Sequence, residues 1–315
     1  AETISLGEFV AFTLYLAMLV WPAIALGWVV GIFQQGAASM ERINVILDTQ
    51  PEIHDDPQAV PLTTIQGDIQ IRNLTFGYND GSRPVLKNIN IDLPAGSILA
   101  IVGRTGSGKT TIMNLLTRTY DPPEGTVFID GLDIKKIPLH ILRLHTGYIP
   151  QETFLFSDTI KANITFGLPA GSDEKIMAAA QAAQIHDTIM EFDDKYETLL
   201  GERGINLSGG QKQRVCIARA IIREPKILLL DDALSAVDTI TEEKILEGLR
   251  TVMQNKTCIW ISHRISAIQN VDQIIVLDEG GIAEQGTHQE LLALEGLYAD
   301  LYEKQKLEEA LDQVE

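Results

Sequence analysis

The chain is poor in cysteine and in basic residues. Its 315 residues include two cysteines, Cys216 and Cys258, whose separation matches no metal-binding spacing. We expect both to be reduced packing residues in the cytosol. Lys and Arg together number 25 against 43 Asp and Glu, which gives a formal net charge of -18. Such a chain lacks the basic stripe that a phosphate backbone requires, so nucleic acid is not an expected partner.

Charge is missing altogether from residues 9–40. Within this stretch, Phe9 to Phe33 is almost wholly apolar and carries Trp21 and Trp28. About 20 apolar residues are enough to cross the hydrocarbon core of a bilayer. A signal peptide would need a basic residue before a shorter run, and a buried helix of a soluble protein would also be shorter. The sequence therefore predicts a transmembrane helix that continues to about Leu47, with a bend allowed at Pro22.

The composition divides the chain into three parts. Residues 1–50 hold the predicted membrane helix and a cytoplasmic extension, where Glu41 and Arg42 balance, so charge does not set the orientation of the helix. Residues 51–66 are polar and broken by prolines, which predicts a linker. Residues 67–315 form the second domain. It starts near Gly67 with alternating apolar residues typical of half-buried antiparallel strands, and it ends in a helical tail after His288.

Four continuous apolar runs in this second domain indicate strands that are buried on both faces. Helical stretches separate them, such as the alanine-rich residues 173–184. This alternation predicts an α/β fold with a parallel sheet covered by helices on both sides. The four runs are Ile98–Val102, Ile227–Leu230, Cys258–Ile261 and Ile274–Leu277.

A glycine-rich loop joins the first of these runs to a helix-like stretch, the context that a phosphate-binding P-loop requires. Glycines let backbone amides curl around an anion, and the N-terminus of the following helix favours the same charge. Lys109 suits the β- and γ-phosphates of a nucleoside triphosphate, and the Thr110 hydroxyl suits Mg²⁺. The loop residues expected to bind the nucleotide are Gly103, Thr105, Gly106, Ser107, Gly108, Lys109, Thr110 and Thr111.

Two further motifs fit the same chemistry. The run Ile227–Leu230 ends in Asp231 and Asp232, and a carboxylate at the end of a buried strand makes Asp231 the expected metal partner. Ser208 is a natural N-cap, and the glycines after it open the backbone at a helix start. This second helix terminus, formed by Ser208, Gly209, Gly210 and Gln211, is expected to bind phosphate.

With these motifs and four more single residues, the chain resembles the ATPase domain of ABC transporters over residues 67–302. Tyr78 in Phe-Gly-Tyr is similar to the aromatic that stacks on adenine. Gln151 in Tyr-Ile-Pro-Gln-Glu resembles the glutamine that reaches Mg²⁺ and the membrane domain. Asp238 ends the loop after the acidic strand, and His263 resembles the switch histidine at the γ-phosphate. All the motifs occur in the order that the family shows.

The resemblance implies an ABC ATPase fold, a P-loop NTPase with an antiparallel β subdomain and a helical subdomain, preceded by one transmembrane helix. It implies ATP and Mg²⁺ as ligands, and a second exporter half whose P-loop receives the Ser208 helix. The loop around Glu202 is similar to that of exporters and would face the membrane domain. The apolar helix would be the last of six in a plasma (inner) membrane exporter of a small molecule or lipid, and Ala1 in place of Met suggests a piece of that longer protein.

Asp232 departs from the family pattern. The resemblance implies glutamate there, which polarises the attacking water, and Asp232 is one methylene shorter. A shift of about 1 Å can cost on the order of a hundredfold in rate. The expected catalytic residues are Lys109, Gln151, Asp232 and His263, in a site that resembles the degenerate half of heterodimeric exporters. A slow homodimer, a regulatory half that binds ATP without useful turnover, and a soluble ABC-type ATPase are the alternatives.

Overall fold

The structure is a computed structural model, and it describes residues 4–78, 83–168, 172–234 and 239–312. Residues 1–52 and residues 53–315 form two compact units. Each unit is described by itself below.

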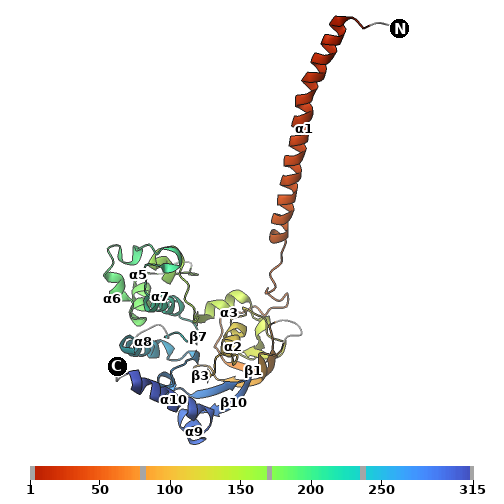
Figure 1. The fold of residues 1–315 in the computed structure, drawn as a ribbon. Helices are drawn as coiled ribbons and strands as arrows, with labels where there is room; N and C mark the ends of the chain where they lie inside the picture. The colour runs from red at the N-terminus through yellow and green to blue at the C-terminus, as the bar shows by residue number, and fades with distance from the viewer. Residues whose placement is uncertain (1–3, 79–82, 169–171, 235–238, 313–315) are drawn as a thin grey trace. The chain divides into compact units, whose positions relative to one another are not determined.

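The described part of the first unit contains one helix, α1 (Leu6–Leu47), which confirms the predicted end near Leu47. It begins at a capping box in which the Glu8 amide donates to the Ser5 hydroxyl and the Ser5 amide donates to the Glu8 carboxylate, at 3.3 Å and 2.9 Å. Figure 1 shows α1 continuing as one helix, and Pro22 lies inside it. No residue of α1 is buried, and Trp21 is 73 % exposed. A helix of 42 residues is roughly 60 Å long, more than a bilayer core requires.

A six-stranded sheet forms the centre of the second unit. Its strand order is β10-β9-β3-β8-β7-β6. The neighbours from β9 to β6 pair in parallel, as the apolar runs predict, and β10 pairs antiparallel with β9 at the edge. The strands are β3 (Ile98–Gly103), β6 (Thr146–Ile149), β7 (Ile227–Asp231), β8 (Thr257–Ile261), β9 (Gln273–Asp278) and β10 (Gly281–Gly286).

This sheet is buried on both faces because its side chains alternate between two separate cores. Along β7, Leu228 and Leu230 belong to one core, while Ile227 and Leu229 belong to the other. Successive side chains of a strand point to opposite faces, so a continuous apolar run is what two covered faces require. Each of these four residues is at most 1 % exposed.

An antiparallel sheet lies in the same unit, with strand order β2-β1-β4-β5. In β2 (Leu86–Leu93) the buried residues Ile89, Ile91 and Leu93 alternate with exposed ones, which confirms the predicted half-buried strands. The partner strand β1 (Ile69–Phe76) pairs Ile71 with Ile91. The sheet is completed by β4 (Val127–Ile129) and β5 (Leu132–Asp133).

Helices cover the sheets, and Figure 1 shows α5, α6 and α7 grouped together as a helical part. The helices are α2 (Lys109–Leu116), α3 (Leu139–His145), α4 (Ile160–Ile164), α5 (Asp173–Ala182), α6 (His186–Met190), α7 (Gly209–Ile221), α8 (Thr239–Met253), α9 (His288–Ala293) and α10 (Leu297–Asp312). Short 3₁₀ turns lie between these elements in the described part of the chain: η1 (Ile134–Lys136), η2 (Lys195–Glu197), η3 (Glu202–Gly204) and η4 (Ile265–Ile268).

The second unit takes up most of the expected linker. It begins at Ile53, and Ile65 is only 2 % exposed. The Leu139 amide donates to the Asp55 carboxylate at 2.6 Å, and an Arg118 guanidinium nitrogen donates to the His54 carbonyl at 3.1 Å. These contacts fix residues 54–55 to the folded domain, so the domain boundary lies before Gly67.

Both cysteines are free thiols inside the second unit, as their spacing predicts. Cys216 is 4 % exposed and Cys258 is fully buried. Burial raises the pKa of both thiols, to about 12 for Cys258.

Candidate functional site

The P-loop is shaped by two glycines at positions where a side chain would be strained. Gly103, at the end of β3, has φ +146°, and a Cβ there would overlap the carbonyl oxygen of Leu277. Gly108 has φ +103° and is the N-cap of α2, where a Cβ would lie 2.7 Å from the Leu86 side chain. Because both positions have left-handed backbone and tight surroundings, the loop must curl as the sequence predicts.

Lys109 opens α2 and is 7 % exposed. Its ammonium donates to the carbonyl oxygens of Gly103 and Arg104, at 2.8 Å and 3.0 Å. Burial lowers the pKa of Lys109, and the charges of Asp231 and Asp232 oppose that shift. The charge thus lies inside the concave loop, where a phosphate would meet it.

Ser107 adds a second polar group to this loop. Its hydroxyl is buried and has no hydrogen-bond partner within the described part of the chain. An unpaired buried hydroxyl costs free energy unless a ligand satisfies it. Ser107 does not line the cavity that gathers most of the other loop residues, so the structure does not bring this predicted residue to the phosphate position.

Asp231 ends β7 and is 2 % exposed. Burial raises the pKa of its carboxyl, while hydrogen bonds from the Thr110 and Tyr148 hydroxyls act in the opposite direction. The Tyr148 hydroxyl donates to the carboxylate over 3.4 Å. The contact with Thr110 places Asp231 beside the start of α2, the place expected for a metal ligand.

A cavity of about 240 Å³ brings the predicted phosphate and metal residues together. Gln151 and His263 line it with the P-loop, although they come from loops after β6 and β8. Two lining residues, Val85 and Ile261, carry no sequence signal because apolar walls look like ordinary core. The predicted residues that line the cavity are Thr105, Gly106, Gly108, Lys109, Thr110, Thr111, Gln151, Asp231, Asp232 and His263.

Asp232 has an unusual backbone, with φ +48°. Its amide donates to the Ile261 carbonyl at 3.0 Å, and its carbonyl accepts from the Gln213 side chain at 3.3 Å. Asp232 and His263 also line a second cavity of about 220 Å³, which shares no other residue with the first. Backbone contacts on both sides thus fix the place from which the Asp232 side chain extends.

Tyr78 lies beside the P-loop helix without lining the phosphate cavity. Its hydroxyl is 2.9 Å from the Thr111 hydroxyl. Its ring meets those of Phe76 and Tyr120 edge to face, with centroids 5.4 Å and 4.9 Å away. Tyr78 is 40 % exposed, so the aromatic group leaves surface for a nucleotide base next to α2. Sequence reasoning missed Tyr120, whose only signal is an aromatic side chain just after the P-loop helix.

The Ser208 helix terminus lies apart from the phosphate cavity. Ser208 caps α7 with a full capping box, since the Gln211 amide donates to the Ser208 hydroxyl at 3.3 Å and the Ser208 amide donates to the Gln211 side chain at 2.9 Å. Ser208 and Gly209 are exposed, and Gly210 and Gln211 are half-buried. The other predicted nucleotide residue, Asp238, lies outside the described residues.

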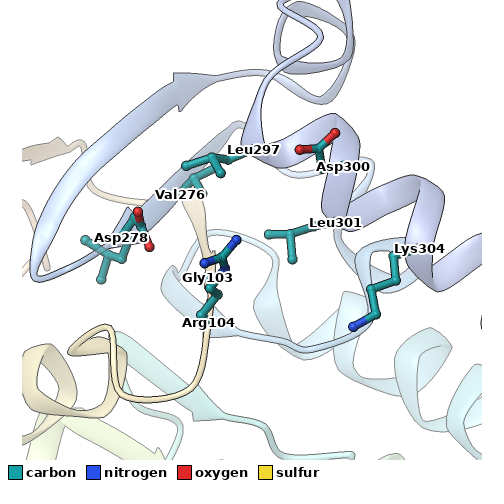
Figure 2. Close-up of a pocket in the computed structure, with 9 residues that line it drawn as sticks. Gly103, Arg104, Val276, Asp278, Leu297, Asp300, Leu301 and Lys304 are labelled. Atoms are coloured by element: carbon teal, nitrogen blue, oxygen red, sulfur yellow. The ribbon is translucent and has the colours of Figure 1, made fainter.

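Another cavity, of about 300 Å³, lies behind the start of the P-loop. Figure 2 shows Arg104 extending into it between the end of β9 and α10. Leu301 and Lys304 of α10 line its far side. The C-terminal helix therefore forms one wall of a space whose other wall is the P-loop itself.

The donor set fits magnesium better than a tightly held transition metal. Thr110, Gln151 and Asp231 offer oxygen atoms, which Mg²⁺ prefers, and they line one cavity. Within the described residues, no group of three or more His, Cys, Asp or Glu side chains could hold a metal ion. A magnesium ion here would need phosphate oxygens as further ligands, as in other nucleotide sites.

Comparison with known proteins agrees with the resemblance stated from the sequence motifs. Residues 86–235 match the model of the family described as "ABC transporter". The chain is 42 % identical over 314 residues to heavy metal tolerance factor 1 of Caenorhabditis elegans, covering 100 % of this chain and 39 % of that protein. It is 43 % identical over 299 residues to the ATP-dependent lipid A-core flippase of Syntrophus aciditrophicus, covering 95 % and 49 %.

A solved structure of a bacterial Atm1-family ABC exporter with ATP bound is also similar. Its TM-score is 0.86 at 43 % identity, over 96 % of this chain and 53 % of that one. The chain thus spans about half the length of these relatives, or less.

Proposed function

This chain carries the ATPase domain of the ABC transporter family, and from that premise we propose that it binds and hydrolyses ATP as one half of a membrane exporter. The observation that carries the proposal is the 240 Å³ cavity, which gathers the P-loop, Gln151, Asp231, Asp232 and His263. These residues come from four separate segments of the chain. Nucleotide binding is the chemistry that accounts for all of them at once.

Each side chain has a distinct task in the proposed reaction, in which water attacks the γ-phosphate and ATP becomes ADP and phosphate. Lys109 and the loop amides hold the phosphates and offset their charge. Asp232 orients the water and accepts its proton, and His263 contacts the γ-phosphate. Thr110, Gln151 and Asp231 would hold Mg²⁺, which neutralises charge that develops on the phosphate oxygens.

The exposed Ser208 terminus supports a dimer. Its anion-binding end lies outside its own chain's phosphate cavity, so a nucleotide held by a second ATPase domain is its natural ligand. We propose that two exporter halves close over two ATP molecules, each capping the other's γ-phosphate. Asp232 favours a heterodimer in which this chain's own site is slow and the partner's site, completed by Ser208, does most of the hydrolysis.

The exposed apolar surface of α1 supports an exporter over a soluble ATPase. It is the one described helix that is long and apolar enough to cross a membrane. We propose that α1 spans the plasma (inner) membrane as the last helix of the exporter's membrane domain, and that the ATPase domain is cytoplasmic. Gln151 and Glu202 would relay closure of the ATPase pair to that domain, which would move a small molecule or lipid.

The test is Lys109→Ala, with Lys244→Ala as control, because Lys244 is an exposed lysine on α8. Removing the Lys109 charge should weaken ATP binding at least tenfold, or abolish turnover in the assembled pair, whereas the control should match the unmodified chain. Binding is measured by titration with ATP, and turnover by phosphate release. Unchanged binding and turnover in Lys109→Ala would refute the assignment of the P-loop.

A further inference from the structure

The C-terminal helix contacts the loop that carries the proposed switch histidine. The backbone amide of Ile265 donates to the side-chain oxygen of Gln305 over 2.7 Å. Ile265 follows His263 by two residues, and Gln305 lies 40 residues further along the chain, in α10. No motif in the sequence points to this bond.

Hydrogen bonds and burial fix the first turn of α10 to the rest of the domain. The amides of Leu297 and Tyr298 donate to the Glu284 carboxylate at 2.6 Å and 3.0 Å. Tyr298 is fully buried, and its hydroxyl is 2.7 Å from a ring nitrogen of His288. Gln305 lies about two turns beyond this anchor. The position of the helix is therefore set independently of the histidine loop.

The histidine loop is held at both ends, with His263 exposed between them. At its start, the Ser262 hydroxyl donates to the Arg264 carbonyl and accepts from the Arg264 amide, both at 3.0 Å. At its far end, Ile265 is 2 % exposed and its amide is bound by Gln305. Loss of the Gln305 bond would remove one of the contacts that fix the far end and would loosen the direction of the His263 side chain.

The same helix also borders the P-loop. Leu301, one turn before Gln305, and Lys304, directly before it, line the cavity into which Arg104 extends (Figure 2). One face of α10 thus lies next to both loops that the γ-phosphate would touch. A support shared by the two loops can set their relative position.

We propose that Gln305 is a positioning residue that fixes the loop presenting His263 to the γ-phosphate. Through Gln305, the C-terminal helix sets how strongly the site prefers ATP over ADP. This inference rests on the proposed function. ADP lacks the γ-phosphate, so a displaced His263 lowers the affinity for ATP and leaves the affinity for ADP unchanged. A lost hydrogen bond of this kind reduces the preference for ATP by roughly fivefold.

The experiment measures the dissociation constants of Mg-ATP and Mg-ADP for the full chain in detergent. The variants are Gln305→Ala, His263→Ala and their double mutant, with Gln305→Glu, which keeps an acceptor oxygen. Lys306→Ala, an exposed neighbour on α10, is the control. We expect Gln305→Ala to reduce the preference for ATP by roughly fivefold, Gln305→Glu and Lys306→Ala to keep it, and the double mutant to equal His263→Ala. Additive losses in the double mutant would overturn the proposal, because they mean that Gln305 acts independently of His263.

Hydrogen exchange gives a second readout that does not depend on nucleotide. The Ile265 amide should exchange faster in Gln305→Ala and at the normal rate in Lys306→Ala. Unchanged exchange would overturn the proposal even if Gln305→Ala is destabilised. If Lys109→Ala abolishes ATP binding but His263→Ala leaves the ATP preference intact, this inference fails and the ATPase assignment stands. If Lys109→Ala binds and turns over ATP normally, the proposed function itself fails.

Discussion

At the scale of single residues, the backbone of Asp232 admits a short acid but does not require one. Its φ of +48° is left-handed, a region that Asp enters more readily than most residues. The chain nevertheless places Glu224, Glu279 and Glu295 at φ +50°, +44° and +51°. A glutamate at 232 is therefore compatible with the backbone, and the shorter side chain is no requirement of the fold.

Asp232→Glu is accordingly expected to raise hydrolysis at this chain's own site. The extra methylene restores a reach whose loss of about 1 Å can cost on the order of a hundredfold in rate. Asp232→Asn should change the hydrolysis rate of the assembled pair little, because the partner's site carries out most of the hydrolysis. Ser208→Arg should strongly reduce that rate, because it blocks the helix terminus that caps the partner's nucleotide. Steady-state phosphate release from the reconstituted pair distinguishes the three. Loss of activity in Asp232→Asn together with tolerance of Ser208→Arg would make Asp232 a working base.

At the scale of secondary-structure elements, Arg118 joins the end of α2 to two distant segments. It is 1 % exposed and pairs with the Asp121 carboxylate at 2.7 Å. Its guanidinium also donates to the carbonyls of His54, Lys135 and Ile137. One buried cation thus ties the P-loop helix to the segment that follows α1 and to η1.

Arg118→Met is expected to destabilise the domain by about 3 kcal/mol, since it removes a buried cation and leaves Asp121 and the carbonyls without their donor. For a domain of this size the thermal midpoint should fall by roughly 6–12 °C. Arg250→Met, which changes an exposed arginine of α8, serves as the control and should stay within roughly 0.5 kcal/mol. Equal midpoints for both variants, by calorimetry or circular dichroism, would show that the Arg118 contacts contribute nothing to stability.

Sequence patterns predicted the elements that carry an apolar run or a clear alternation, and they missed strands without either, such as β6 and β10. The runs behind β3, β7, β8 and β9 are wholly apolar, because both faces of the sheet are covered. β6 reads Thr-Gly-Tyr-Ile and β10 is a polar edge strand, so neither produces such a run. The residues of the site also divide into those that a local sequence pattern predicts and those that it does not. The P-loop and the Asp231 strand end are local patterns, whereas the contact between Gln305 and Ile265 joins distant segments and exists only in the fold.

At the scale of the whole molecule, the two compact units differ in whether their apolar side chains are exposed or buried. α1 exposes its apolar side chains along its length, while the second unit buries two complete cores. Apolar surface of this extent is unfavourable in water and favourable in lipid.

Removal of residues 1–52 should therefore leave residues 53–315 soluble and folded without detergent, because that unit has its own cores. The 315-residue chain should instead float with phospholipid vesicles in a density gradient and aggregate without them. Circular dichroism of the shortened protein checks that its fold persists. A full chain that stays monomeric and dispersed in plain buffer would contradict the assignment of α1 to the membrane.

The two buried thiols have a practical consequence for spectroscopy. Cys216 is 4 % exposed, Cys258 is fully buried, and burial raises the pKa of both. Because the thiolate is the form that reacts with maleimides, neither side chain should label at neutral pH while the domain is folded. A single cysteine introduced on the surface would thus carry a fluorophore or spin label without prior removal of native residues, and distances across a closing pair could be followed in an otherwise unaltered chain.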